Sequence, residues 1–133
     1  MLERTMSGTT FSNLRKGILS DLRSRVYTAI VEFYKEPAIV VTHYKEYVKL
    51  KRAFKEANFL PEQAISATVF SRGYKAARKG VLGDMNKPGH VAVVNSFGEP
   101  DLVILPHKYY LALKAAYEAS LGVKGQGNSL SGK

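Results

Sequence analysis

Apolar residues recur at helical spacing in two stretches of the chain, at about residues 11–24 and 68–85. They are Phe11, Leu14, Ile18 and Leu22 in the first stretch, and Phe70, Tyr74, Ala77, Val81 and Met85 in the second. Steps of three and four residues place such side chains on one face of an α-helix. The pattern therefore predicts two amphipathic helices, the second of which is terminated by Pro88-Gly89.

Each of these helices is followed by two runs rich in Val, Ile, Tyr and Phe. The runs cover about residues 26–34 and 38–42, and again 90–96 and 101–105. β-Branched and aromatic residues in short runs favour strands, so we expect two β-hairpins with turns at Lys35-Glu36-Pro37 and Gly98-Glu99-Pro100. A closing helix should follow each hairpin. The apolar face should contain Tyr47, Leu50 and Phe54 in the first closing helix, and Tyr110, Leu113 and Tyr117 at equivalent places in the second.

The two stretches are copies of one another at a constant offset. Without a gap, residues 15–56 lie over residues 78–119, and 15 of these 42 positions are identical. Chance at average composition would give about two or three identities. RKGILSDL at 15–22 and RKGVLGDM at 78–85 are the clearest matching pair. We interpret the chain as a tandem duplication.

The duplication predicts an α+β fold made of two tandem helix–β-hairpin–helix repeats. The first repeat should cover residues 9–57, a short linker 58–65, and the second repeat 66–121. Residues 122–133, which are rich in Gly and Ser, should form a flexible polar tail after a helix that ends near Gly122. One repeat of about 50 residues would bury only a thin core and leave sheet edges exposed. We therefore expect the repeats to pack on each other as an intrachain pseudo-dimer.

The charge of the chain favours an anionic partner. Lys and Arg total 20 against 11 Asp and Glu, which gives a net charge of +9. An excess of this size on a small protein most often serves nucleic acid, although solubility alone is the alternative. The candidate DNA-binding residues lie in or near the first helix of each repeat: Arg15, Lys16, Arg72, Lys75, Arg78 and Lys79.

Catalytic chemistry has little support in the sequence. The chain contains no Cys, and His43, His90 and His107 show none of the spacings typical of metal ligands. His43 and His107 fall near the starts of the closing helices, where a capping or surface role is the usual one. We therefore expect no catalytic residues, no metal and no cofactor. The sequence offers no membrane-spanning run and no signal-peptide core, which predicts a cytoplasmic protein without a membrane partner.

The sequence of residues 65–105 resembles that of a known family. ISATVFSRGYKAARKGVL at 65–82 and HVAVVNSFGEPDLVIL at 90–105, followed by Tyr110 and Leu113, resemble the prevent-host-death (Phd/YefM) antitoxins. Those proteins open with a short strand and a segment like I-S-x-T-x-F-S-R. They continue with a helix, a hairpin containing P-x-x-V-L, and a helix containing Tyr-x-x-Leu. The first copy matches in TTFSN (9–13), EPAIVVT (36–42) and EYVKL (46–50).

The resemblance implies a compact α+β unit that dimerises through its sheet. It also implies repression of the protein's own operon through DNA binding by the first strand and helix of a dimer, and neutralisation of a toxin through a C-terminal segment. Arg72 falls where the family places a DNA-contacting Arg, and Asn13 stands there in the first copy. We expect a small regulator of bacterial, plasmid or phage origin that binds double-stranded DNA as a single-chain pseudo-dimer. The alternatives are a module that binds a toxin or another host protein without DNA, and a structural subunit of a larger assembly. The pseudo-dimer could also pair further into a homo-oligomer.

Overall fold

The computed structural model describes residues 2–54, 59–72, 74–83 and 89–132, without the side chains of residues 69, 71, 72 and 123–132. Its strands are β1 (Glu3–Ser7), β2 (Thr28–Phe33), β3 (Glu36–His43), β4 (Glu62–Ser66), β5 (Val91–Ser96) and β6 (Glu99–Pro106). Its helices are α1 (Gly8–Asn13), α2 (Arg15–Arg23), α3 (Tyr44–Ala53), α4 (Ala67–Arg72), α5 (Tyr74–Leu82) and α6 (His107–Gly132). We call residues 2–54 the N-terminal segment and residues 59–132 the C-terminal segment.

The strands form one six-stranded sheet in the order β1-β2-β3-β6-β5-β4. The outer pairs β1·β2 and β4·β5 are parallel, and the other neighbours are antiparallel. At the centre β3 pairs with β6, and the register sets Val41 opposite Ile104, the residue with which the sequence repeat aligns it. Ile39 faces Pro106 and His43 faces Leu102 in the same ladder. The expected α+β class is confirmed.

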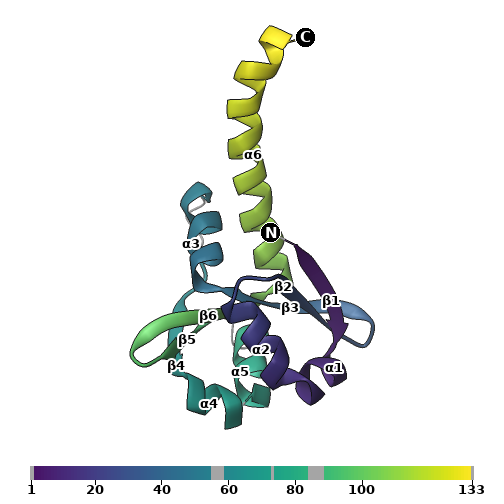
Figure 1. The fold of residues 1–133 in the computed structure, drawn as a ribbon, viewed down its shortest axis with the longest axis vertical. Coiled ribbons are helices and arrows are strands. Elements are labelled where there is room, and N and C mark those ends of the chain that lie inside the picture. The colour runs from purple at the N-terminus through teal and green to yellow at the C-terminus, as the bar shows by residue number, and fades with distance from the viewer. Residues whose placement is uncertain (1, 55–58, 73, 84–88, 133) are drawn as a thin grey trace.

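Helices cover both faces of the sheet (Figure 1). α1, α2, α4 and α5 lie on one face, and α3 and α6 lie on the other. In β3, Ile39 and Val41 contribute to the core under the first group of helices, whereas Val40 contributes to the core under α3 and α6. Successive strand side chains point to opposite faces, so a central strand buried on both faces requires a continuous apolar run.

The first helix of the N-terminal segment differs from the expected one. A single helix over 11–24 was predicted, but α1 and α2 are separate helices that meet at Leu14. Ser7 caps α1, since its hydroxyl accepts a hydrogen bond from the Thr10 N–H at 3.0 Å. Because the helix restarts after Leu14, that side chain leaves the apolar face and is 60% exposed. The expectation that Leu14 belongs to the core was therefore wrong.

Both hairpin turns lie one residue earlier than predicted. Phe33 pairs with Glu36 and Ser96 pairs with Glu99, which leaves two-residue turns at Tyr34-Lys35 and Phe97-Gly98. Pro37 and Pro100 are strand residues, and each lies next to a register shift, since the pairing skips the residue that follows the proline, Ala38 in β3 and Asp101 in β6. A β-bulge tolerates a residue without an N–H donor, and this explains why the prolines lie within the strands rather than in the turns.

Two short edge strands were not found from the residue pattern. Residues 3–7 lie before the expected first repeat, and residues 62–65 were assigned to the linker, yet residues 3–7 form β1 and residues 62–66 form β4. Their residues, with the sequences ERTMS and EQAIS, are largely polar and largely exposed. An edge strand with little apolar alternation gives a weak sequence signal. Only the family resemblance pointed to an opening strand.

The distance along the sequence between equivalent elements of the two segments is not the same for the first helices as for the hairpins. α2 and α5 begin at Arg15 and Tyr74, and this step along the chain is shorter than the step from Thr28 to Val91, where β2 and β5 begin. The extra residues of the C-terminal segment lie between the end of α5 and the start of β5. Arg15 is thus the first residue of α2, while Arg78 is the fifth residue of α5. The ungapped alignment that paired these two residues does not match their positions in the helices.

The end of α6 lies beyond the expected one. The helix was predicted to end near Gly122, but it extends to Gly132 (Figure 1). Flexibility of residues 122–133 stays a prediction. The helix predicted over about 68–85 was expected to end at Met85 and Pro88-Gly89, which lie mostly outside the described residues. The last described helix of this region, α5, ends at Leu82.

Two carboxylates tie the segments together in a crossed manner. Glu3 of β1 accepts hydrogen bonds from the Tyr110 hydroxyl at 2.6 Å and from Lys114 Nζ at 2.7 Å, both on α6. Glu62 of β4 accepts hydrogen bonds from the Tyr47 hydroxyl at 2.6 Å and from Lys51 Nζ at 2.5 Å, both on α3. The edge strand of each segment is therefore held by the closing helix of the other.

These contacts lower the pKa of both carboxyl groups. Partial burial alone raises the pKa of Glu3, but the hydrogen bonds from Lys114 and Tyr110 and the charge of Lys114 outweigh it. For Glu62, burial is likewise outweighed by Lys51 and Tyr47. The same hydrogen bonds stabilise the neutral phenols and, together with burial, raise the pKa of Tyr47 and of Tyr110.

Removing both carboxylates should flatten the acid dependence of stability. A lowered folded-state pKa contributes stability above the ordinary Glu value of 4.5, and this contribution is lost as the pH falls through the folded-state pKa. We expect the Glu3→Gln/Glu62→Gln variant to be less stable at pH 7 and to lose less stability between about pH 5 and pH 3. Urea denaturation at several pH values measures this.

The matched control is Glu36→Gln/Glu99→Gln, which removes two exposed carboxylates from the hairpins. It should keep the acid dependence of the wild type. Equal curves for the two double variants would show that the crossed contacts add no net stability.

Candidate nucleic-acid interface

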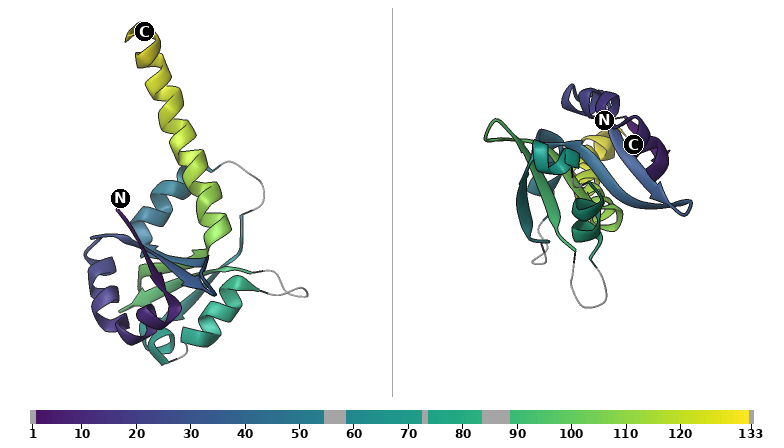
Figure 2. Two further views of the ribbon diagram at one scale, coloured as in Figure 1. Left: turned by 90° about the vertical axis from the view of Figure 1, so that its right-hand side faces the viewer. Right: turned by 90° about the horizontal axis from the view of Figure 1, so that it is seen from below.

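The helices α1, α2, α4 and α5 form a strongly basic layer. Residues 8–23 and 67–82 contain seven Lys and Arg residues and one carboxylate, Asp21. All four helices lie on the same face of the sheet (Figure 2). Five of these seven cations line two adjoining grooves.

The first groove, which we call the α2 groove, runs along α2 and has a volume of about 470 Å³. Its lining residues are Ser12, Asn13, Arg15, Lys16, Leu19 and Arg23. Arg15 lies with its guanidinium 5.5 Å from the centre of the Tyr74 ring on α5. Arg23 forms an ion pair with Asp101 at 2.6 Å, which joins α2 to β6. Lys16 is exposed.

The second groove, which we call the tip groove, lies between α1, the β2–β3 turn and α5, and has a volume of about 670 Å³. Three of its lining residues are cationic: Lys35 from the turn, and Lys75 and Arg78 from α5. The Arg78 guanidinium lies 4.4 Å from the centre of the Phe33 ring. Glu32 is the one acidic residue among those that line the groove in the described part of the chain.

Ser12 and Asn13 line both grooves, so the two grooves are continuous across the end of α1. Six cationic side chains from both segments therefore surround one strip of surface: Arg15, Lys16, Arg23, Lys35, Lys75 and Arg78. The hydroxyl of Ser12 and the amide of Asn13 add neutral hydrogen-bonding groups between the cations. We call this strip the basic face. Arg and Lys side chains with hydroxyl and amide groups are the usual partners of phosphate oxygens in DNA.

Two arginines of the basic face, Arg15 and Arg78, lie over aromatic rings. A guanidinium over such a ring is attracted by the ring's quadrupole, which favours this position of the side chain. Tyr74 is buried, and burial raises its pKa to about 12, although the charges of Arg78 and Arg15 act in the opposite direction. Tyr74 therefore stays neutral and packs beneath Arg15.

The six candidates from the sequence have different positions in the structure. Arg15, Lys16, Lys75 and Arg78 line the basic face. Lys79 is exposed on the last turn of α5 and lines neither groove. Arg72 is the last residue of α4, and its side chain lies outside the described ones.

Two residues of the basic face were missed by the sequence interpretation. Arg23 was not chosen because it lies outside the repeated Arg-Lys pair, and Lys35 was read only as part of a turn. A signal for Arg23 was available, since the helical spacing from Lys16 to Arg23 places both on one face of α2. Lys35 gave no such signal, because only the folded hairpin brings it next to α5.

His43 has the capping role that the sequence suggested. It is the N-cap of α3, and its Nδ1 accepts a hydrogen bond from the Lys45 N–H at 3.0 Å. Burial and the charge of Arg25 lower the pKa of His43, which favours the neutral ring that can accept this bond. Within the described residues, no three His, Asp or Glu side chains lie close enough to hold a metal ion.

No known family model, curated protein or solved structure matches this chain. The similarity to the Phd/YefM antitoxins consequently stays a prediction from the sequence. Among the helices in the described part of the chain, none has the length and apolar character needed to cross a bilayer.

Proposed function

We propose that this chain binds double-stranded DNA through the basic face and acts as a small cytoplasmic regulator of the antitoxin and autorepressor type. The observation that carries the proposal is the junction of the α2 groove and the tip groove. It gathers six cations around a strip that holds Ser12 and Asn13. Non-specific DNA affinity arises mainly from phosphate neutralisation by Lys and Arg. A strip of this composition suits a phosphate backbone.

The proposal includes a tandem duplication that folds as a single-chain pseudo-dimer. Three observations support it. The central ladder is symmetric about the Val41–Ile104 pair, which the sequence repeat also aligns. The element order of the two segments is the same. Each edge strand is held by the closing helix of the other segment. DNA readers with twofold symmetry present two equivalent elements to two half-sites, and the first helices of the segments would have that role.

Removing cations from the basic face should reduce both the DNA affinity and its salt dependence. Lys16→Ala/Lys75→Ala removes one exposed cation from each groove. We expect weaker binding to every duplex sequence, and a slope of log affinity against log salt that is smaller by about two, because each phosphate contact contributes roughly 0.9. Fluorescence anisotropy titrations of a 20-base-pair duplex at three salt concentrations measure the slope.

The matched control is Lys45→Ala/Lys108→Ala, which removes two exposed cations at the starts of α3 and α6, on the other face of the sheet. It changes the net charge equally and should keep the wild-type slope. Equal losses in both variants would mean that the total charge, and not the basic face, determines binding. An Arg72→Ala variant tests the family position, where loss of a base contact costs about 1–3 kcal/mol at one position of a half-site.

A protein partner is the second candidate. α6 projects well beyond the sheet in Figure 1, and it exposes Leu111 and Leu121. An exposed helix with apolar residues suits a groove on a toxin or another host protein. Absence of salt-sensitive DNA binding by the wild type would favour this candidate.

A further inference from the structure

The turn between β2 and β3 has an unusual composition for its conformation. Tyr34 and Lys35 both have positive φ values, 56° and 65°. Two-residue hairpin turns with two positive φ values favour Asn-Gly, because other side chains are strained in the left-handed region. The Tyr34 side chain is also 100% exposed, so it adds nothing to the core that could offset this strain. Strained residues without a packing role indicate a functional role for the side chains concerned.

The surroundings of Tyr34 indicate the kind of partner. Tyr34 stands at the wall of the tip groove, whose lining includes the cations Lys35, Lys75 and Arg78 and the single carboxylate Glu32. The two α5 cations come from the C-terminal segment and the turn comes from the N-terminal one, so the groove exists only in the folded chain. A flat exposed ring beside a net positive groove fits a ligand with an anion next to an apolar surface. The sugar–phosphate backbone of DNA has both.

The opposite hairpin provides a comparison within the same molecule. Phe97 is as exposed as Tyr34 and also has a positive φ, 52°. The hollow beside it, of about 470 Å³, is lined by residues 64–68 and 95–98, and none of these is charged. The two hairpins turn at opposite sides of the molecule, β2–β3 on the right and β5–β6 on the left of Figure 1. Among the described side chains, the two tips thus share an aromatic residue but differ in charge.

We propose that the tip groove is the part of the basic face that holds one strand of the sugar–phosphate backbone at the flank of the bound duplex, and that Tyr34 adds an aromatic contact there. Lys35, Lys75 and Arg78 contact the phosphates, and the Tyr34 ring packs on the neighbouring deoxyribose. The described residues around the Phe97 tip offer no equivalent phosphate contact. The inference rests on the proposed DNA binding, and it adds that the grip is stronger at the β2–β3 end.

The experiment compares Tyr34→Ala, Tyr34→Phe, Phe97→Ala and Lys35→Ala with the wild type, using the full chain and the same 20-base-pair duplex at three salt concentrations. Tyr34→Ala should weaken binding about fivefold, as expected for one lost contact of about 1 kcal/mol, without a change in the salt slope. Tyr34→Phe keeps the ring and should bind like the wild type. Phe97→Ala should stay within about twofold of the wild type, and Lys35→Ala should reduce the slope by about 0.9. Because all three positions are exposed, thermal unfolding should confirm that each variant is folded.

The outcomes separate this inference from the proposed function. If the wild type binds no duplex, both are overturned. If Lys16→Ala/Lys75→Ala reduces the salt slope while Tyr34→Ala binds like the wild type, DNA binding by the basic face stands and the Tyr34 contact is overturned. Equal losses for Tyr34→Ala and Phe97→Ala would also overturn it, because the contact would then not depend on the charged groove.

Discussion

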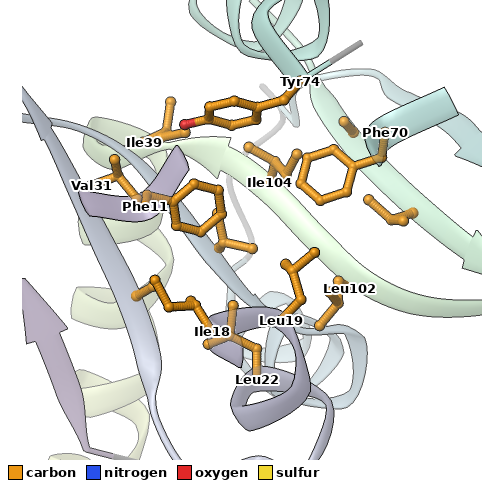
Figure 3. Close-up of a cluster of buried hydrophobic side chains, with 14 of the residues drawn as sticks. Phe11, Ile18, Leu19, Leu22, Val31, Ile39, Phe70, Tyr74, Leu102 and Ile104 are labelled. Carbon is orange, nitrogen blue, oxygen red and sulfur yellow. The ribbon is translucent and has the colours of Figure 1, made fainter. Parts of the chain in front are cut away.

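Replacing Phe11 by alanine should lower the free energy of unfolding by about 3–5 kcal/mol, the usual range for a buried phenylalanine. Phe11 is fully buried in the core beneath α1, α2, α4 and α5. Its ring centre lies 5.1 Å from that of Tyr74, which in turn lies 5.9 Å from that of Phe70 (Figure 3). These three rings connect α1 with α4 and α5. The truncation would therefore leave a cavity between the two segments.

Urea denaturation followed by far-ultraviolet circular dichroism measures the change, with Leu14→Ala as the control. Leu14 is the residue after α1 and is 60% exposed, so its truncation should cost less than about 0.5 kcal/mol. A Phe11→Ala variant as stable as the Leu14→Ala variant would show that α1 does not pack on the sheet as described.

The hydrophobic pattern predicted the hairpins and most of the core because those features depend on local periodicity. The expected core faces of the closing helices are correct: Tyr47, Leu50, Tyr110 and Leu113 are all buried. The continuous apolar runs of β3 and β6 also gave a clear signal, since those strands are covered on both faces. Prediction failed where local rules gave no signal. β1 and β4 are polar edge strands, and the break at Leu14 interrupts an otherwise regular apolar spacing.

The basic face was predicted only in part because it is a tertiary feature. The charge and the repeated Arg-Lys pair directed attention to Arg15, Lys16 and Arg78. The repeated pair wrongly suggested equivalent positions in the two helices. Additional residues before β5 place Arg78 further along α5 than Arg15 lies along α2. The tip groove could not be inferred, because Lys35 meets Lys75 and Arg78 only after a hairpin of one segment packs beside a helix of the other.

Leu113→Ala should lower the free energy of unfolding by about 2–5 kcal/mol, through the core on the other face of the sheet. Leu113 is fully buried in the cluster that joins α3 and α6 to the sheet, together with Tyr47, Leu50 and Val103. The lost methyl groups would leave a cavity lined by residues of both segments. Because the six strands form one sheet, the loss should appear as a shift of one cooperative transition and not as separate unfolding of α6.

Leu111→Ala is the control on the same helix, since Leu111 is 48% exposed and its truncation should cost less than about 0.5 kcal/mol. Hydrogen exchange adds a test of cooperativity. In the Leu113→Ala variant, amide protection in β2 and β5 should fall by the same free energy, although these strands belong to different segments. Loss of protection in β5 alone would mean that the C-terminal segment unfolds by itself. The sheet register at Val41 and Ile104 would then not couple the two segments energetically.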